Sequence, residues 1–334
     1  MACNSPPTRG IRGTSLWVTS RGGCAFMPPD GRWGGFVASD AQQGGMSDIT
    51  PFALTASDGR TLSATLFEPA GPVVANVVLL GAWAVPQRFY RRFATWLCER
   101  GFRILTFDVR GIGESLQGSV RDELATTTDW ACLDHGAALT WLAEQPGPHL
   151  AVGHSFGGQV PGITDQATCI DGLYTVGSQL GYWGHFEGLN RHKMRVIFTV
   201  LMPAMIRVFG YLPRWAGLGE DVPPNALLEW AKWLRSPGYL LDHVAGAHER
   251  FASWPGKIQM VGFTDDDFAP PDAVAMLASC YSPDRLTVQT RMPAEVGQSK
   301  VGHVGFFRSL GRAELWPECA AQLQSWAGEM APDA

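Results

Sequence analysis

The chain has 334 residues, of which 46% are hydrophobic and 17% charged, and its formal net charge is −5. This length and hydrophobic content suffice for one large folded domain, or for a core with a sizeable insertion. The low charged fraction and the lack of a basic run argue against nucleic acid as the main partner and favour a small molecule.

Residues 1–45 are rich in glycine, proline, serine and arginine, and they show neither strand alternation nor helical periodicity. We expect this N-terminal extension to be disordered. Arginines outnumber acids here, but no apolar segment precedes a small-residue cleavage site, so a secretory signal is not expected. The favoured interpretation is a tail that reflects translation from upstream of a natural start at Met46, and a targeting segment is the alternative.

A regular pattern of strands and helices begins after Met46. Residues 51–69 predict two alternating strands joined at the turn dipeptide Asp58-Gly59. Further strands are predicted at 73–80, 102–109, 149–153 and 170–179, and helices at 88–101 and 130–145. Continuous apolar strands that alternate with helices predict a mostly parallel sheet covered by helices on both faces.

The pattern stops at residues 180–251, which contain four tryptophans, several methionines and many prolines. So long a departure predicts an inserted helical cap rather than a loop. Strands at 257–263 and 286–292 and helices at 271–281 and 313–330 then complete the pattern. The expected organisation is an α/β core built from residues 46–179 and 252–334, with the cap at 180–251.

A G-x-S-x-G motif, Gly153-His154-Ser155-Phe156-Gly157, follows an apolar strand directly. In this context the serine lies on a sharp strand-to-helix turn, where bulky neighbours would collide. Ser155 is therefore a candidate nucleophile, and a plain glycine-rich turn is an equally good interpretation of the motif alone.

A serine hydroxyl needs a base to take its proton, and an imidazole base needs a carboxylate to orient it. His303 follows the last predicted strand, whereas the other histidines considered fall in a helix, next to a strand or in the insertion. Three carboxylates, Asp265, Asp266 and Asp267, follow the strand 257–263. Like charges cannot all be buried beside one imidazole. We favour Asp266 as its partner, with Asp265 as the alternative.

These segments together resemble the α/β-hydrolase superfamily, and more narrowly its bacterial predicted hydrolases and serine aminopeptidase-like members. The resemblance extends from about Met46 to the C-terminus. It is carried by "QRFYRRFATWLCERGFRILTFDVRGIGES", "VGHSFGGQ", "FTDDDFAP" and "GHVGFFR", while "LLEWAKWLRSPGYLLD" resembles the cap of the narrower group. The order Ser, Asp, His along the chain is the order of this superfamily.

The resemblance also implies an oxyanion hole made of two backbone N–H groups. Phe156, directly after the nucleophile, would supply one of them. Trp83 would supply the other, although Gly81-Ala82 precedes it where many hydrolases have His-Gly. The loop 108–115 would shape the floor of the site. Serine at position 155 disfavours dehalogenase and epoxide hydrolase chemistry, which need a carboxylate nucleophile.

Aromatic and methionine side chains of the predicted cap have two interpretations. They line an acyl or alcohol pocket, or they pack the cap, and for Trp230 and Trp233 packing is favoured. The candidate lining residues are Trp183, Phe186, Met202, Trp215, Trp230 and Trp233. The apolar segment 196–206 lies between Arg195 and Arg207 and contains Pro203, so it is too short to span a membrane. We expect a buried cap helix there, with contact to a membrane surface as the alternative.

Seven scattered cysteines without C-x-x-C spacing predict neither a zinc site nor a disulfide framework, and they favour a reducing cytoplasm. The sequence thus predicts a cytoplasmic serine hydrolase that cleaves an ester or related acyl bond without cofactor or metal. Thioesterase, peptidase and acyltransferase activities use the same machinery. The alternative from another class is a non-catalytic protein of this fold that binds an apolar ligand or a partner.

Overall fold

The computed structural model describes residues 47–330. The predicted N-terminal extension therefore lies outside the described residues. Within them, no helix combines the length and the apolar character needed to cross a membrane.

One sheet of eight strands, formed by the described part of the chain, runs through the protein in the order β1-β2-β4-β3-β5-β6-β7-β8. The strands are β1 (Asp48–Thr55), β2 (Thr61–Glu68), β3 (Ala75–Leu80), β4 (Phe102–Phe107), β5 (His149–His154), β6 (Gly172–Val176), β7 (Lys257–Phe263) and β8 (Leu286–Arg291). Strands β3 to β8 pair in parallel, whereas β2 pairs antiparallel with both β1 and β4. The predicted mostly parallel sheet is confirmed.

The first two strands form the predicted hairpin. Thr55 lies opposite Thr61, and the backbone N–H of Ala56 donates to the carbonyl of Arg60 across the turn. Gly59 has a φ of +84°, a conformation that glycine adopts without steric cost. The Asp58-Gly59 dipeptide thus closes the turn where the sequence predicts it.

Helices follow most of the strands. Their bounds are α1 (Arg91–Cys98), α2 (Thr127–Asp129), α3 (Gly136–Ala143), α4 (Gly188–Val196), α5 (Met202–Phe209), α6 (Pro224–Leu234), α7 (Ala247–Ser253), α8 (Pro271–Ala278) and α9 (Leu315–Met330). A π-helical turn, Trp130–His135, joins α2 to α3, and another, Ile197–Leu201, joins α4 to α5. The helix predicted at 130–145 therefore begins earlier, where Thr126 and Asp129 form a capping box.

Two buried apolar clusters lie on the two faces of the sheet. One includes side chains of α1 and α9, and the other includes side chains of α3, α7 and α8. Alternate residues of β3 divide between them, with Val78 and Leu80 in one cluster and Val77 and Leu79 in the other. This alternation explains why a strand buried on both faces reads as an unbroken apolar run in the sequence.

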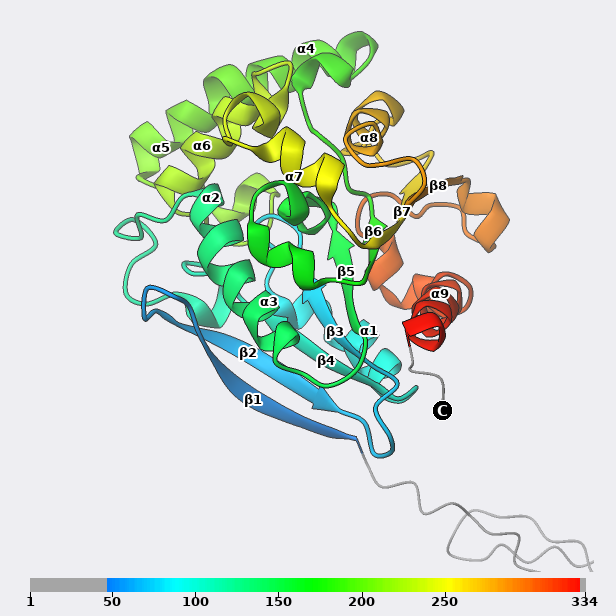
Figure 1. The fold of residues 1–334 in the computed structure, drawn as a ribbon. Coiled ribbons are helices and arrows are strands. Elements are labelled where there is room, and N and C mark those ends of the chain that lie inside the picture. The colour runs from blue at the N-terminus through cyan, green and yellow to red at the C-terminus, as the bar shows by residue number, and fades with distance from the viewer. Residues whose placement is uncertain (1–46, 331–334) are drawn as a thin grey trace, which may run out of the picture. The chain divides into compact units, whose positions relative to one another are not determined.

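Helices α4, α5 and α6 belong to the segment between β6 and β7 that we propose as a cap, and Figure 1 shows them together at the top, with β1 and β2 at the bottom. Polar contacts join α6 to α2. The Thr127 hydroxyl donates to the carbonyl of Ala226 at 2.9 Å, and Glu229 accepts from the backbone N–H of Thr128 at 2.7 Å. These contacts hold α6 against the core.

Candidate active site

Ser155 lies directly after the last residue of β5, at the beginning of a 3-10 helix, Ser155–Gly162. Its φ is +51°, a left-handed conformation that costs a residue with a Cβ about 1–3 kcal/mol. The glycines around it leave no room for side chains. A Cβ on Gly157 would lie 2.0 Å from the carbonyl oxygen of Leu80, and one on Gly153 would lie 2.9 Å from the nitrogen of Gly158. The motif thus forms a tight, strained turn.

His303 lies in the loop that follows β8, and its Nδ1 is 2.8 Å and 3.1 Å from the two carboxylate oxygens of Asp266. The Asp266 side chain is inaccessible to solvent, and its Oδ1 also accepts the backbone N–H groups of Phe268 and Ala269. These bonds satisfy a buried carboxylate, whose charge would otherwise be costly. An ionised Asp266 acts only as an acceptor, so the proton of the neutral His303 ring lies on Nδ1 and leaves Nε2 as a base.

Asp265 makes different contacts. Its carboxylate accepts the backbone N–H of Val301 at 2.9 Å and the backbone N–H of Gly302 at 3.0 Å. The residues immediately before His303 are therefore tied to the end of β7. The geometry places Asp266 against the imidazole and Asp265 against its loop, while Asp267 is exposed.

The residue before the serine, His154, is fully buried and connects two other segments. Its Nε2 is 2.8 Å from the carbonyl oxygen of His303, and its Nδ1 is 2.9 Å from the hydroxyl of Tyr90. A carbonyl only accepts, so Nε2 carries the proton and Nδ1 accepts from Tyr90. Burial, together with the proximity of His303, lowers the pKa of His154 to about 3, so the ring is neutral at physiological pH.

The loop after β3 completes this network. The backbone N–H of Ala82 donates to the Tyr90 hydroxyl at 2.7 Å, so one chain of hydrogen bonds joins Ala82, Tyr90, His154 and the backbone of His303. The next residue, Trp83, has a backbone N–H that forms no hydrogen bond within residues 47–330. An unpaired N–H at this position is suited to bind a negatively charged oxygen.

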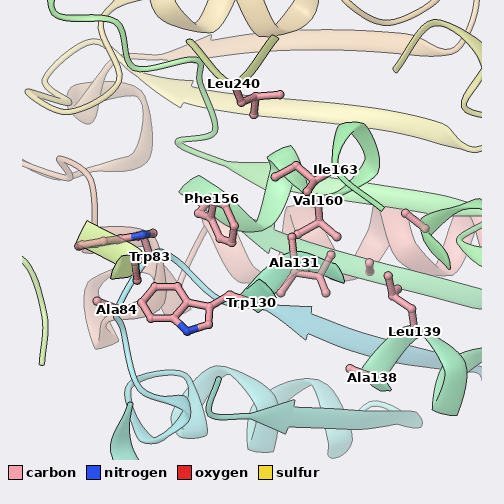
Figure 2. Close-up of a cluster of buried hydrophobic side chains, with 14 of the residues drawn as sticks. Trp83, Ala84, Trp130, Ala131, Ala138, Leu139, Phe156, Val160, Ile163 and Leu240 are labelled. Atoms are coloured by element: carbon pink, nitrogen blue, oxygen red, sulfur yellow. The ribbon is translucent and has the colours of Figure 1, made fainter. Parts of the chain in front are cut away.

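The Trp83 side chain is locked in place. Its indole N–H donates to the Thr127 hydroxyl at 3.1 Å, and its ring stacks on Trp230 with the centroids 4.1 Å apart. Figure 2 shows Trp83, Trp130 and Phe156 in the same cluster of buried side chains. The two residues predicted to supply oxyanion donors are therefore held by packing.

A cavity of about 870 Å³ opens over these residues. Its lining includes Trp83, His154, Ser155, Trp230 and His303. Along residues 47–330, no direct hydrogen bond joins the Ser155 hydroxyl to His303. Catalytic hydrogen bonds are often long without substrate and shorten when it binds.

The candidate lining residues of the proposed cap differ in their burial and in whether they line the cavity. Trp230 packs against the core cluster and also lines the cavity, so both interpretations of this residue stay open, whereas Trp233 is wholly buried, as packing predicts. Phe186 and Met202 are buried in the core cluster, and Trp215 is 65% exposed. Residues 196–206 are buried on one side only, because Phe198 and Met202 belong to the core cluster whereas Val196, Val200 and Leu201 are about half exposed.

Residues 77–312 match the model of the family described as "Alpha/beta hydrolase family". The chain belongs to this family. The predicted superfamily is thus confirmed for this α/β hydrolase, while the narrower likeness to serine aminopeptidase-like members stays a prediction. No curated protein matches the chain in sequence.

Solved structures support the same fold. The esterase domain of a Rhodothermus marinus protein is 14% identical with a TM-score of 0.51, over 84% of this chain and 98% of that one. A thermophilic esterase from Thermogutta terrifontis is 14% identical with a TM-score of 0.52, over 85% of this chain and all of that one. A haloalkane dehalogenase variant from Bradyrhizobium elkanii has a TM-score of 0.59 at 14% identity, over 85% of this chain and all of that one. Such likeness shows the fold of this α/β hydrolase and not its substrate.

Sequence reasoning brought Ser155, Asp266 and His303 into consideration, but it missed His154 and Tyr90. One signal for His154 was present in the sequence: it stands directly before the candidate nucleophile, at the end of an apolar strand. Tyr90 carried no comparable signal, since it is one of several aromatic residues near the start of α1.

Proposed function

We propose that this α/β hydrolase is a serine hydrolase that cleaves an ester or a related acyl bond through an acyl-enzyme intermediate. The observation that carries the proposal is the convergence of Ser155 and His303 on one cavity, with the His303 Nδ1 held by the buried Asp266. A strained serine beside a positioned imidazole is the arrangement that activates a hydroxyl.

In the proposed reaction the Ser155 hydroxyl oxygen attacks the substrate carbonyl, and its proton passes to the Nε2 of His303. The imidazolium that forms is stabilised by the Asp266 carboxylate, which itself stays ionised. His303 then gives the proton to the leaving alcohol as the carbon–oxygen bond breaks. Water, deprotonated by His303 in turn, attacks the acyl-enzyme and releases the acid and the free Ser155.

The tetrahedral intermediates carry a negative charge on the former carbonyl oxygen. The backbone N–H groups of Phe156 and Trp83 are proposed to bind it. Each such donor typically contributes about 2.7–4 kcal/mol to the transition state. The unpaired N–H of Trp83 and the position of Phe156 in the first turn of its helix, where N–H groups lack intrahelical partners, support this role.

The substrate class follows from the cavity. Aromatic rings such as Trp83, Phe89 and Trp230 line it, so an apolar acyl or alcohol group is favoured. The chemistry uses no cofactor and no metal ion. Thioesters and amides would react by the same steps, and two neighbours in fold being described as esterases supports the ester.

A fluorophosphonate probe, which modifies only activated serines, tests the proposal. We expect labelling of the wild-type protein and none of Ser155→Ala, strong reduction in His303→Ala, and full labelling in the control Ser253→Ala, since Ser253 ends α7 outside the cavity. A folded wild-type protein that is never labelled would overturn the proposal in favour of a non-catalytic binding protein.

A separate experiment tests which aspartate is the partner of His303. Asp266→Asn is expected to lower kcat by about 10⁴, since an amide favours the wrong tautomer of the histidine. Asp265→Asn should reduce activity less, and Asp267→Asn should not change it. The order would be reversed for the first two if Asp265 were the partner of His303.

A further inference from the structure

The outer part of the proposed cap presents one long helical segment, 188–209, made of α4, the π-helical turn Ile197–Leu201 and α5. We call it the outer helix. Its inner side is formed by Met194, Phe198 and Met202, which are buried in the core cluster at a spacing of four residues. The opposite side has no partner within residues 47–330, and in Figure 1 α4 and α5 lie at the upper rim of the molecule.

The side of the outer helix that faces solvent is apolar. Val196, Val200 and Val208 repeat at multiples of four residues, which places them on one side of a helix. Their neighbours include Leu189, which is 88% exposed, and Trp215, which is 65% exposed. We call this set, together with the exposed Leu201, the outer face. Exposed apolar patches of this kind mark interaction sites more often than chance.

The stretch of chain that carries the outer face is basic. Residues 187–216 contain one acidic residue, Glu187, in a chain that is acidic overall. The basic residues of the same stretch are Arg191, Lys193, Arg195, Arg207 and Arg214, all of them exposed. None of the five forms an ion pair with another described residue.

We infer that the outer face binds an anionic lipid surface. Aliphatic side chains and a tryptophan bordered by arginine and lysine are the features of helices that lie in the headgroup region of a bilayer. Each basic residue near an anionic bilayer contributes about 1 kcal/mol. A second copy of the chain is a poorer partner, because a twofold dimer through this face would set the five positive charges against themselves.

The outer face lies near the cavity, so contact with a lipid surface there would bear on access to the cavity. Only Ala216 separates Trp215 from the loop 217–220, and each residue of that loop lines the cavity that holds Ser155. A lipid surface under the outer face would therefore lie close to the cavity entrance. The inference does not depend on the hydrolase proposal, because binding needs neither Ser155 nor His303.

Sedimentation with vesicles tests whether the outer face binds an anionic lipid surface. The experiment uses the full chain with Ser155→Ala, so that hydrolysis plays no part. We expect binding to vesicles of equal parts phosphatidylcholine and phosphatidylglycerol at low salt, little binding to pure phosphatidylcholine, and release at high salt. Lys193→Gln with Arg207→Gln should weaken binding about tenfold or more. Val200→Ser with Val208→Ser should weaken it several-fold.

Matched controls change the same residue types elsewhere. Arg91→Gln with Arg92→Gln on α1, and Val288→Ser on β8, should leave binding unchanged, since these exposed residues belong to other elements. Equal loss in the controls, or no binding to phosphatidylglycerol vesicles, would overturn the inference. So would light scattering that shows a dimer dissociated by the outer-face variants, because a second copy would then cover this surface.

Discussion

The ring of His154 donates from Nε2 to the backbone carbonyl of His303, 2.8 Å away, although the two residues are 149 positions apart in the chain. Through this bond the turn that carries Ser155 is connected to the loop that carries its proposed base. Tyr90 extends the connection to Ala82, next to the proposed oxyanion donor Trp83. One neutral histidine thus joins three segments whose relative positions determine the geometry of the site.

Replacing Tyr90 by phenylalanine tests this network. The Ala82 N–H would lose its acceptor and His154 its donor, so we expect kcat to fall about tenfold, with KM changed less than twofold because the cavity keeps its shape. The control is Tyr174→Phe, which removes another buried hydroxyl, on β6, and should leave kcat unchanged. Steady-state kinetics with a p-nitrophenyl ester measure both. Equal effects of the two variants would mean that Tyr90 is merely structural.

Gly219 tests the contact between the proposed cap and the oxyanion loop. A Cβ at Gly219 would lie 2.3 Å from the carbonyl oxygen of Ala84, which also accepts the backbone N–H of Glu220. We expect Gly219→Ala to displace Ala84 and its neighbour Trp83 and to lower kcat/KM at least tenfold. In the control Gly147→Ala the backbone is also left-handed, but the Cβ meets nothing within 4 Å and the residue is not part of the cavity lining, so this variant should lose stability without losing kcat/KM.

Trp230 is expected to limit the length of the acyl chain. Its ring stacks on Trp83 and forms part of the cavity wall. Trp230→Ala should move the preference in a series of p-nitrophenyl esters towards longer chains, whereas Trp230→Phe, which keeps an aromatic ring there, should move it less. An unchanged profile in the alanine variant would place the acyl group elsewhere in the cavity.

Stability in acid should depend on His135, which is wholly buried beside Phe107 and Phe156. Burial lowers its pKa to about 4 from the ordinary 6.5. Below pH 6.5 His135 therefore binds a proton in the unfolded chain but not in the folded protein. The free energy of unfolding falls as the pH drops towards 4. Above pH 6.5 the ring is neutral in both states and contributes no pH dependence.

The size of this effect can be measured with His135→Gln, which does not titrate. Between pH 7 and pH 4 the wild-type protein should lose about 3 kcal/mol more stability than the variant in urea unfolding. His154, buried in the same way, is present in both proteins and cancels from the difference. Parallel pH profiles would contradict the assigned pKa.

The central strands β3 and β5 could be predicted because burial on both faces makes each one an apolar run, and the hairpin β1–β2 could be predicted from its alternation and its turn dipeptide. Their bounds were less accurate, since a strand ends where its neighbours stop pairing. The candidate residues Ser155 and His303 could be found because a motif and the position after the last strand restrict them.

Other features depend on contacts that no local pattern contains. Which of Asp265 and Asp266 faces the imidazole depends on how the loop before His303 lies on the end of β7. The bond between Tyr90 and His154 joins residues 64 positions apart. The exposure of Val200 agrees with the alternative for segment 196–206 rather than with the favoured buried helix, because an apolar helix has the same sequence pattern whether or not a neighbour covers it.

The left-handed backbone at Ser155 has a consequence for the stability of the whole protein. At an ordinary helical position glycine is less stable than alanine by about 0.5–1 kcal/mol. At position 155 the order should reverse, with Ser155→Gly more stable than Ser155→Ala, because only glycine relaxes in this conformation. The turn that exposes the hydroxyl would then be a site where natural selection has kept activity in preference to thermal resistance.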